Sequence, residues 1–291
     1  MEGGMLSTGI RLTLYRMGLR ITSRAAPVIA SRALEKRFLS PARHSVPAWE
    51  SALAASATIT WLSTRSGEAI PVYRWGEGPA ILLVHGWSSR GTQLGRFIGP
   101  ARDQGFSVIT FDAPGHGCSA ARLTGLPEMI DALEQVIAAH QSIAGVVAHS
   151  LGTVAASYVL GHLGTEIPSV YIAPPQEPGR YLAMVGDRMN VTPKAVSLAQ
   201  RRIEQRFGTR FLELNHLELA QHVPGRVLVV HDHGDKEVAF EEGQRVAQAL
   251  ANSTLRSTTG LGHRRILKSE DVVKMAINHL LAKGQKPLSH R

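Results

Sequence analysis

Five short apolar runs dominate the sequence between residues 80 and 232, and each is long enough for one strand. They read AILLVHG, FSVITFDA, AGVVAHS, SVYIAPP and RVLVVHD. Nearly continuous apolar character is typical of parallel strands that are buried on both faces. Helical patterns separate the runs; in LPEMIDALEQVIAAH, Pro127 stands near the first turn and Met129 and Leu133 share one side. This alternation predicts an α/β fold, with a mostly parallel doubly wound sheet and helices on both faces.

Two further features refine this fold class. The segments ATITWLS and AIPVYRWG precede the apolar runs, alternate in character and predict a hairpin of two strands. The segment from about residue 176 to residue 224 contains helical patterns but no clear strand. An ordinary crossover needs only about a dozen residues. We therefore interpret this insertion as a short helical cap over a pocket, with a long helical crossover as the alternative.

Charge and cysteine content exclude several classes of protein. The net charge is +9, but residues 1–44 hold eight basic and two acidic residues, so most of the excess lies there. The rest of the chain has no basic stripe interleaved with aromatic residues, and we expect no nucleic-acid partner. The single cysteine, Cys118, excludes an intrachain disulfide and favours a reducing compartment such as the cytoplasm.

Residues 1–50 are expected to form a basic, amphipathic helical arm. One face would carry Leu6, Ile10, Leu14, Met17 and Ile21, and another face Arg16, Arg20 and Arg24. Three interpretations stay open: the apolar stripe docks on the body of the protein, which we favour, or the arm contacts a membrane surface, or it is an arginine-rich targeting segment.

Chemically useful side chains follow several of the predicted strands. The sequences at these positions are His85-Gly86-Trp87, His149-Ser150-Leu151-Gly152 and His231-Asp232-His233-Gly234-Asp235; His263 follows beyond the last expected strand, in TGLGHRRIL. Reactive groups of such sheets gather at the carboxyl ends of the strands. The chain therefore brings a hydroxyl, a carboxylate and an imidazole to one edge, in the order Ser, Asp, His.

These three groups meet the needs of nucleophilic catalysis. A serine hydroxyl is a weak nucleophile until an imidazole takes its proton, and the imidazole needs a carboxylate to fix its tautomer. Oxyanion charge that develops on the substrate needs preorganised donors, which the backbone N–H groups of Trp87 and Leu151 could supply. These residue types, in this order, therefore suit nucleophilic catalysis by a serine.

This order of motifs resembles the α/β-hydrolase family over roughly residues 57–283. The matching segments are LLVHGW, FDAPGHGCS, AHSLG, HDHGDKEV and GLGHRR, and the last two are most similar to bacterial members of the family. The resemblance implies an α/β-hydrolase domain over residues 51–291 that includes the cap. It assigns Ser150 as the nucleophile and His263 as the base. It assigns Asp235 as the acid, because the family places this residue three positions before a valine, here Val238. Asp232 is the competing candidate.

One position departs from the family pattern. The elbow reads G-x-S-x-G in the family, and here the first glycine is Ala148, whereas Gly152 keeps the second. Alanine adds one methyl group, which a small displacement of the helix would accommodate. The alternative is that Ser150 is an ordinary hydroxyl at the start of a helix.

Several nearby residues invite other interpretations. His231 and His233 with the two aspartates could suggest a metal site, but no further ligand set with recognisable spacing follows, so no metal is expected. The histidines before the loop and the nucleophile, together with the one in PGHG, are expected to be structural: His85, His149 and His116. Arg264 and Arg265 follow the base. They could bind an anionic group of a substrate, or they could have a role at the surface or at an interface.

The sequence therefore predicts a serine hydrolase that cleaves a carboxylic ester or thioester of a small acyl substrate through an acyl-enzyme, without a cofactor. An acyltransferase with the same triad, or a non-catalytic ligand-binding protein on this fold, is the alternative. In the predicted cap, apolar and adaptable side chains would suit a medium-chain acyl group, or would simply hold the cap in place: Tyr181, Leu182, Met184 and Met189.

Overall fold

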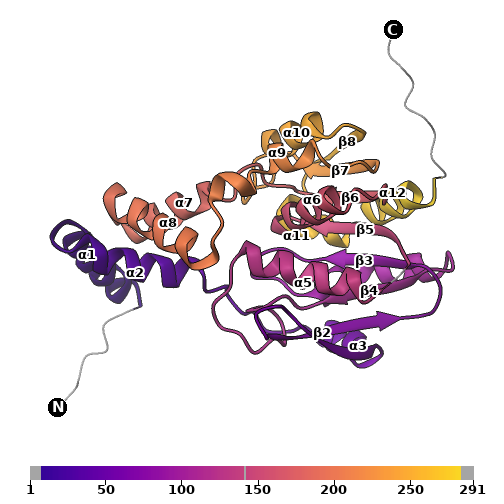
Figure 1. Ribbon diagram of the computed structural model, residues 1–291, viewed down its shortest axis with the longest axis horizontal. Helices are drawn as coiled ribbons and strands as arrows, with labels where there is room; N and C mark the ends of the chain where they lie inside the picture. The colour runs from indigo at the N-terminus through magenta and orange to yellow at the C-terminus, as the bar shows by residue number, and fades with distance from the viewer. Residues whose placement is uncertain (1–7, 141, 283–291) are drawn as a thin grey trace, which may run out of the picture. The chain divides into compact units, whose positions relative to one another are not determined.

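The computed structural model describes residues 8–140 and 142–282 of the 291-residue chain (Figure 1). The described residues divide into two compact units. Unit 1 combines the described part of Met1–Ser40 with Pro178–Glu213, and unit 2 combines Pro41–Glu177 with the described part of Leu214–Arg291. Segments that are distant in the sequence thus fold together in each unit.

Unit 2 contains an eight-stranded sheet in the order β1-β2-β4-β3-β5-β6-β7-β8. The strands are β1 Thr58–Ser63, β2 Ala69–Trp75, β3 Ala80–Val84, β4 Ser107–Phe111, β5 Ile143–His149, β6 Ser169–Ile172, β7 Val227–Asp232 and β8 Ser253–Thr258. β2 runs antiparallel to β1 and to β4, and all other neighbours are parallel. The predicted hairpin and the predicted mostly parallel sheet are both confirmed.

Helices connect these strands and cover the sheet (Figure 1). Those of unit 2 are α3 Ala48–Ala55, α4 Ile98–Arg102, α5 Leu126–Ala138, α6 Leu151–Leu163, α9 His216–Ala220, α10 Phe240–Ala249, α11 Gly262–Arg265 and α12 Glu270–Leu281. Local sequence explains where they begin. Pro127 lies in the first turn of α5, where the Glu128 carboxylate accepts from the Gly125 N–H at 2.9 Å.

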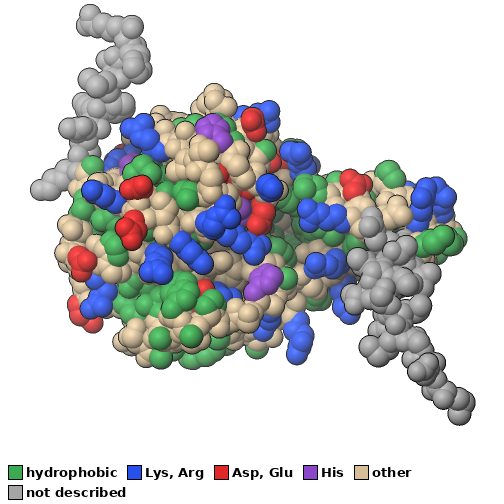
Figure 2. Space-filling view, turned by 180° about the vertical axis from the view of Figure 1, so that it is seen from behind, with side chains coloured by type: hydrophobic (Ala, Val, Ile, Leu, Met, Phe, Trp, Pro, Cys, Tyr) green, Lys and Arg blue, Asp and Glu red, His purple; other side chains and the backbone are tan. Residues whose placement is uncertain are grey.

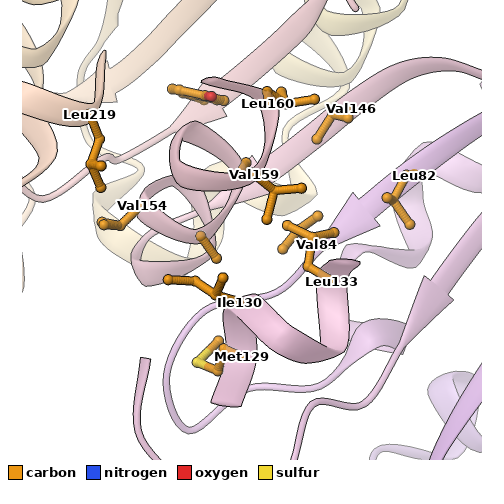
Figure 3. Close-up of a cluster of buried hydrophobic side chains, with 14 of the residues drawn as sticks. Leu82, Val84, Met129, Ile130, Leu133, Val146, Val154, Val159, Leu160 and Leu219 are labelled. Atoms are coloured by element: carbon orange, nitrogen blue, oxygen red, sulfur yellow. The ribbon is translucent and has the colours of Figure 1, made fainter. Parts of the chain in front are cut away.

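The core consists of two apolar clusters, because side chains of a strand alternate between the faces of a sheet. Leu82 and Val84 of β3 belong to the cluster that includes α5 and α6, which Figure 3 shows. Ile81 and Leu83 of the same strand belong to the other cluster, with α4 and α12. All four side chains are buried. Burial on both faces explains why the strand sequences are apolar without interruption.

Unit 1 is helical and consists of α1 Thr8–Ala25, α2 Pro27–Phe38, α7 Arg180–Met189 and α8 Pro193–Phe207. The Ser23 hydroxyl accepts from the Thr192 N–H at 3.2 Å, and the Ser23 carbonyl accepts from the Thr192 hydroxyl at 3.1 Å. Arg202 of α8 forms an ion pair with Glu35 of α2 at 2.6 Å. The N-terminal helices and the inserted helices, which the sequence presents as separate features, therefore pack against each other.

The apolar stripe expected on the N-terminal arm is described only in part. Leu6 and the side chains of Ile10 and Leu14 lie outside the part that the structure describes. Met17 and Ile21 are exposed, whereas Leu19 and Ser23 on another side of α1 are buried. Within unit 1, α1 packs through its Leu19 and Ser23 side and not through Met17 and Ile21. Docking of the stripe on the body of the protein stays a prediction. No helix among residues 8–140 and 142–282 is long and apolar enough to cross a membrane.

Candidate active site

Ser150 lies on the turn that joins β5 to α6. Its backbone angles are φ 52° and ψ −127°, a conformation that costs a non-glycine residue about 1–3 kcal/mol. Its N–H donates to the Ile172 carbonyl at 2.9 Å, and its carbonyl accepts from the Thr153 hydroxyl at 2.6 Å. A strained serine between a strand and a helix is the geometry of a nucleophile elbow. The alternative of an ordinary serine in a relaxed helix start does not account for this strain.

Two glycines make room for the turn. A Cβ atom on Gly152 would lie 2.5 Å from the His85 carbonyl oxygen, and a Cβ on Gly86 would lie 2.9 Å from the Ser150 Cβ. Both distances are shorter than any stable contact between these atoms. The loop after β3 and the start of α6 therefore approach each other closely only because both residues lack side chains.

Ala148 occupies the position where the family has glycine. Its backbone lies between Val84 of β3 and Tyr171 of β6, and its methyl group is fully buried in the core cluster that includes α5 and α6. With this methyl group in the core, Ser150 still has the positive φ of the elbow turn. The departure from the family pattern is compatible with the turn.

Three of the side chains singled out in the sequence form one hydrogen-bonded row. The Ser150 Oγ lies 3.0 Å from Nε2 of His263, and Nδ1 of His263 lies 2.7 Å from Oδ2 of Asp235. Since a carboxylate can only accept, Nδ1 carries the proton and the Nε2 lone pair faces the serine hydroxyl. The structure thus brings Ser150, His263 and Asp235 together with an imidazole tautomer suited to accept the serine proton.

Asp235 is held in its charged form by several donors. Its Oδ1 accepts from the N–H groups of Glu237 at 2.8 Å and of Val238 at 2.9 Å. Nε2 of His231 lies 3.4 Å from its Oδ2. Burial alone would raise the pKa of Asp235, but hydrogen bonds from His231, His263 and Val238 outweigh it and hold the pKa below its ordinary value. The carboxylate is therefore ionised when His263 needs a counter-charge.

Asp232, the competing acid, serves a different purpose. It accepts from the N–H groups of Gly234 and Leu261, each at 2.9 Å, and from the Thr258 hydroxyl at 2.8 Å. Burial alone would raise the pKa of Asp232, but the N–H groups of Gly262, Leu261 and Gly234 and the Thr258 hydroxyl lower it overall. Asp232 thus links the turn after β7 to the loop that carries the histidine base through hydrogen bonds. Asp235 contacts the base itself.

The three histidines expected to be structural all have structural partners. Nε2 of His149 donates to the His263 carbonyl at 2.9 Å, which links the nucleophile strand to the histidine loop. His85 accepts from the Ala113 N–H at 3.0 Å, and His116 lies 2.9 Å from the Pro114 carbonyl. Burial lowers the pKa of all three, that of His116 to about 3, so they are neutral near pH 7.

The predicted oxyanion donors lie beside the serine. Leu151 is the first residue of α6, so its N–H has no acceptor within the helix and is available at the elbow. Trp87 follows Gly86, which approaches the Ser150 Cβ closely. The Trp87 ring packs edge-on against His116, with 5.2 Å between the ring centroids.

Sequence reasoning missed residues that hold the loop after β3. Asp112, at the end of β4, accepts from the N–H groups of Gly91 and Cys118, each at 2.9 Å. Glu50 of α3 is buried, forms an ion pair with Arg90 at 2.6 Å and accepts from the Thr92 hydroxyl at 2.9 Å. An acidic residue directly after a buried strand was a signal for Asp112; no local pattern marks Glu50.

The remaining candidates lie apart from this row. Arg264 forms an ion pair with Glu237 at 2.9 Å, and Arg265 donates to the Gly260 carbonyl at 2.8 Å. The exposed ring of His233 packs on Phe240, with 3.9 Å between the centroids. Within the described part of the chain, no group of three or more His, Cys, Asp and Glu side chains is arranged to hold a metal ion.

An eight-stranded, mostly parallel sheet with a serine, an acid and a histidine at its strand ends defines an α/β-hydrolase fold. The chain belongs to the alpha/beta hydrolase family, whose sequence profile matches residues 81–261. The family inferred from the sequence is thereby confirmed. No curated protein sequence matches the chain.

Solved structures share this fold at low sequence identity. An esterase of Pyrococcus furiosus is 19% identical with a TM-score of 0.63, and the match covers 83% of this chain and 98% of the esterase. The thioesterase domain from the curacin biosynthetic pathway is 18% identical with a TM-score of 0.56, over 77% and 99% of the two chains. A bromoperoxidase of Bacillus anthracis is 18% identical with a TM-score of 0.57, over the same two fractions. The similarity shows the fold, which carries more than one reaction.

Proposed function

We propose that this protein is a serine hydrolase that cleaves a carboxylic ester or thioester. The observation that carries the proposal is the row from Ser150 through His263 to Asp235, with contacts of 3.0 and 2.7 Å. Esterases and a thioesterase domain among the structural neighbours are consistent with this reaction class.

The geometry supports a reaction in two halves. In the first, the Ser150 Oγ attacks the acyl carbon while its proton moves to Nε2 of His263. The backbone N–H groups of Leu151 and Trp87 would stabilise the oxyanion, and donors of this kind each contribute about 3 kcal/mol in serine hydrolases. His263 then gives its proton to the leaving alcohol or thiol, and the acyl group stays on Ser150.

In the second half, water replaces the leaving group. His263 accepts a proton from the water as its oxygen attacks the acyl carbon, and the Ser150 Oγ leaves with the proton from Nε2. The products are the free acid and the original enzyme. Asp235 keeps its charge throughout and stabilises the imidazolium that forms in each half.

Covalent labelling with a fluorophosphonate probe tests the proposal. The wild-type protein should be labelled, and the variants Ser150→Ala and His263→Ala should lose labelling while keeping the wild-type circular dichroism spectrum. A panel of esters, thioesters and amides then identifies the acyl class, and added alcohols or amines reveal acyl transfer as a second product. Failure to label a folded wild-type protein would contradict the proposal and favour a non-catalytic ligand-binding protein.

A further inference from the structure

Large apolar side chains are exposed around the junction of α1 and α2. Met17, Ile21, Val28 and Ile29 have exposed fractions of 59%, 65%, 47% and 60%. Ile21 lies just over one helical turn before the junction at Ala26, and Val28 and Ile29 follow it directly. Single exposed apolar residues are ordinary, but a group of them marks an interaction surface. We call the surface formed by these four residues the corner patch.

Folding of unit 1 does not use the corner patch. Among residues 17–38, the buried side chains are Leu19 and Ser23 of α1 and Ala30, Ser31, Leu34 and Glu35 of α2. Ile21 and Ile29 therefore lie on sides of α1 and α2 that face away from these buried side chains, and the two isoleucines are not required to hold the helices in place.

The net charge of the chain is concentrated in the same unit. By sequence, unit 1 holds 14 basic and 5 acidic residues, a net charge of +9, whereas unit 2 holds 18 of each. Near the corner patch, Arg20, Arg24 and Arg32 are exposed and form no ion pair with any described residue. The acidic side chains Glu35 and Glu213 of unit 1 already pair with Arg202 and Arg210.

Figure 2 shows apolar side chains (green) and basic side chains (blue) together on one face of unit 1. A nucleic acid offers phosphates to the arginines but no apolar medium for Met17, Ile21 and Ile29. A bilayer with anionic lipids offers both, because apolar side chains enter the headgroup boundary by about 5–10 Å while basic groups bind the headgroups. We propose that the corner patch and its arginines bind the surface of a membrane that contains anionic lipids. This inference does not rest on the proposed function.

Co-sedimentation of the full-length protein with vesicles tests the proposal. Vesicles of phosphatidylcholine with phosphatidylglycerol should pellet the protein, and vesicles of phosphatidylcholine alone should pellet much less. The variant Ile21→Ser/Ile29→Ser should weaken binding about tenfold or more, because two apolar side chains no longer enter the headgroup boundary. The variant Arg20→Gln/Arg24→Gln/Arg32→Gln should weaken binding about a hundredfold, because three basic groups no longer bind the anionic headgroups.

Control variants remove exposed apolar and basic side chains from unit 2. Leu163→Ser removes another exposed apolar side chain, and Arg122→Gln/Arg256→Gln/Lys274→Gln removes three exposed charges. Both controls should pellet like the wild type. Equal pelleting of the Ile21/Ile29 variant and the wild type would overturn the proposal, as would equal losses in the controls. Tight binding of duplex DNA that the isoleucine substitutions leave unchanged would also overturn it and indicate a nucleic-acid partner.

Discussion

The Asp232 carboxylate accepts a hydrogen bond from the Leu261 N–H, 2.9 Å away and two residues before the histidine base. Asp235, three residues further along the same turn, contacts the side chain of that base at 2.7 Å. One turn after β7 therefore carries two carboxylates, of which the first positions the histidine loop and the second orients the imidazole.

Asparagine substitutions separate these two contributions. In Asp235→Asn, the amide oxygen can keep the bonds from Glu237 and Val238, but an NH₂ group would face Nδ1 of His263. This favours the wrong tautomer, and we expect kcat to fall by about 10⁴-fold, as for other serine hydrolases. Steady-state kinetics on the best ester of the panel measures this loss, while the free energy of unfolding should change little.

Asp232→Asn should instead lose more unfolding free energy than activity. It leaves the Thr258 hydroxyl and the Leu261 N–H without their shared acceptor. Loss of these buried bonds should cost roughly 3 kcal/mol of unfolding free energy, measured by urea denaturation. If the two variants lost activity and stability in equal proportion, the division of roles between the aspartates would be wrong.

The alanine at the elbow gives a second prediction. Ala148→Gly should keep labelling by the fluorophosphonate probe and lose about 1 kcal/mol of stability, because glycine in a strand costs entropy and removes a buried methyl group. Gly152→Ala provides the contrast. Its Cβ would lie 2.5 Å from the His85 carbonyl oxygen, so labelling should fall by at least about tenfold as the elbow shifts. A glycine variant at 148 that labels much faster than wild type would show that the alanine impairs the site.

Glu50 provides a third prediction, far from the reacting atoms. Glu50→Gln removes the charge that pairs with Arg90 in a buried site on the loop after β3. Removing one partner of a buried ion pair typically lowers the free energy of unfolding by about 3–5 kcal/mol. We expect a lower melting temperature and slower acylation, since this loop carries Trp87. The double variant Glu50→Gln/Arg90→Gln should recover part of the lost stability, and a further loss would contradict the argument.

The sequence predicted what depends on local pattern. Continuous apolar runs indicated the parallel strands, whose carboxyl ends indicated the edge where reactive groups gather. The choice of Ser150, Asp235 and His263 at this edge came from the resemblance to the hydrolase family. Distances between these side chains were not predictable, since they depend on backbone conformations such as φ 52° at Ser150.

Contacts between distant segments were not predictable from the sequence. The amphipathic pattern of the N-terminal arm identified an apolar stripe but not which side of α1 is covered. The bonds from Thr192 to Ser23, across 169 residues of sequence, turn Met17 and Ile21 to the exposed side. Nothing near Glu50 in the sequence indicates that it holds a loop 40 residues away.

The buried histidines give a final prediction, on stability as a function of pH. Burial lowers the pKa of His216 to about 4 and that of His116 to about 3, from an ordinary value of 6.5. Below pH 6.5 the unfolded chain takes up protons at these residues and the folded chain does not. The contribution of these two histidines to the free energy of unfolding is therefore fully present above pH 6.5. It falls as the pH decreases, by up to about 1.4 kcal/mol per pH unit for each histidine.

Urea denaturation between pH 7 and pH 4.5 should show this slope, and His216→Gln should reduce it by the share of one histidine. Glutamine can still donate to the Pro175 carbonyl, which lies 2.8 Å from the His216 ring, but takes up no proton. The same substitution at His162, on the exposed side of α6, is the control for the change of residue type. An unchanged slope in His216→Gln would mean that His216 is protonated in the folded protein and that burial does not lower its pKa.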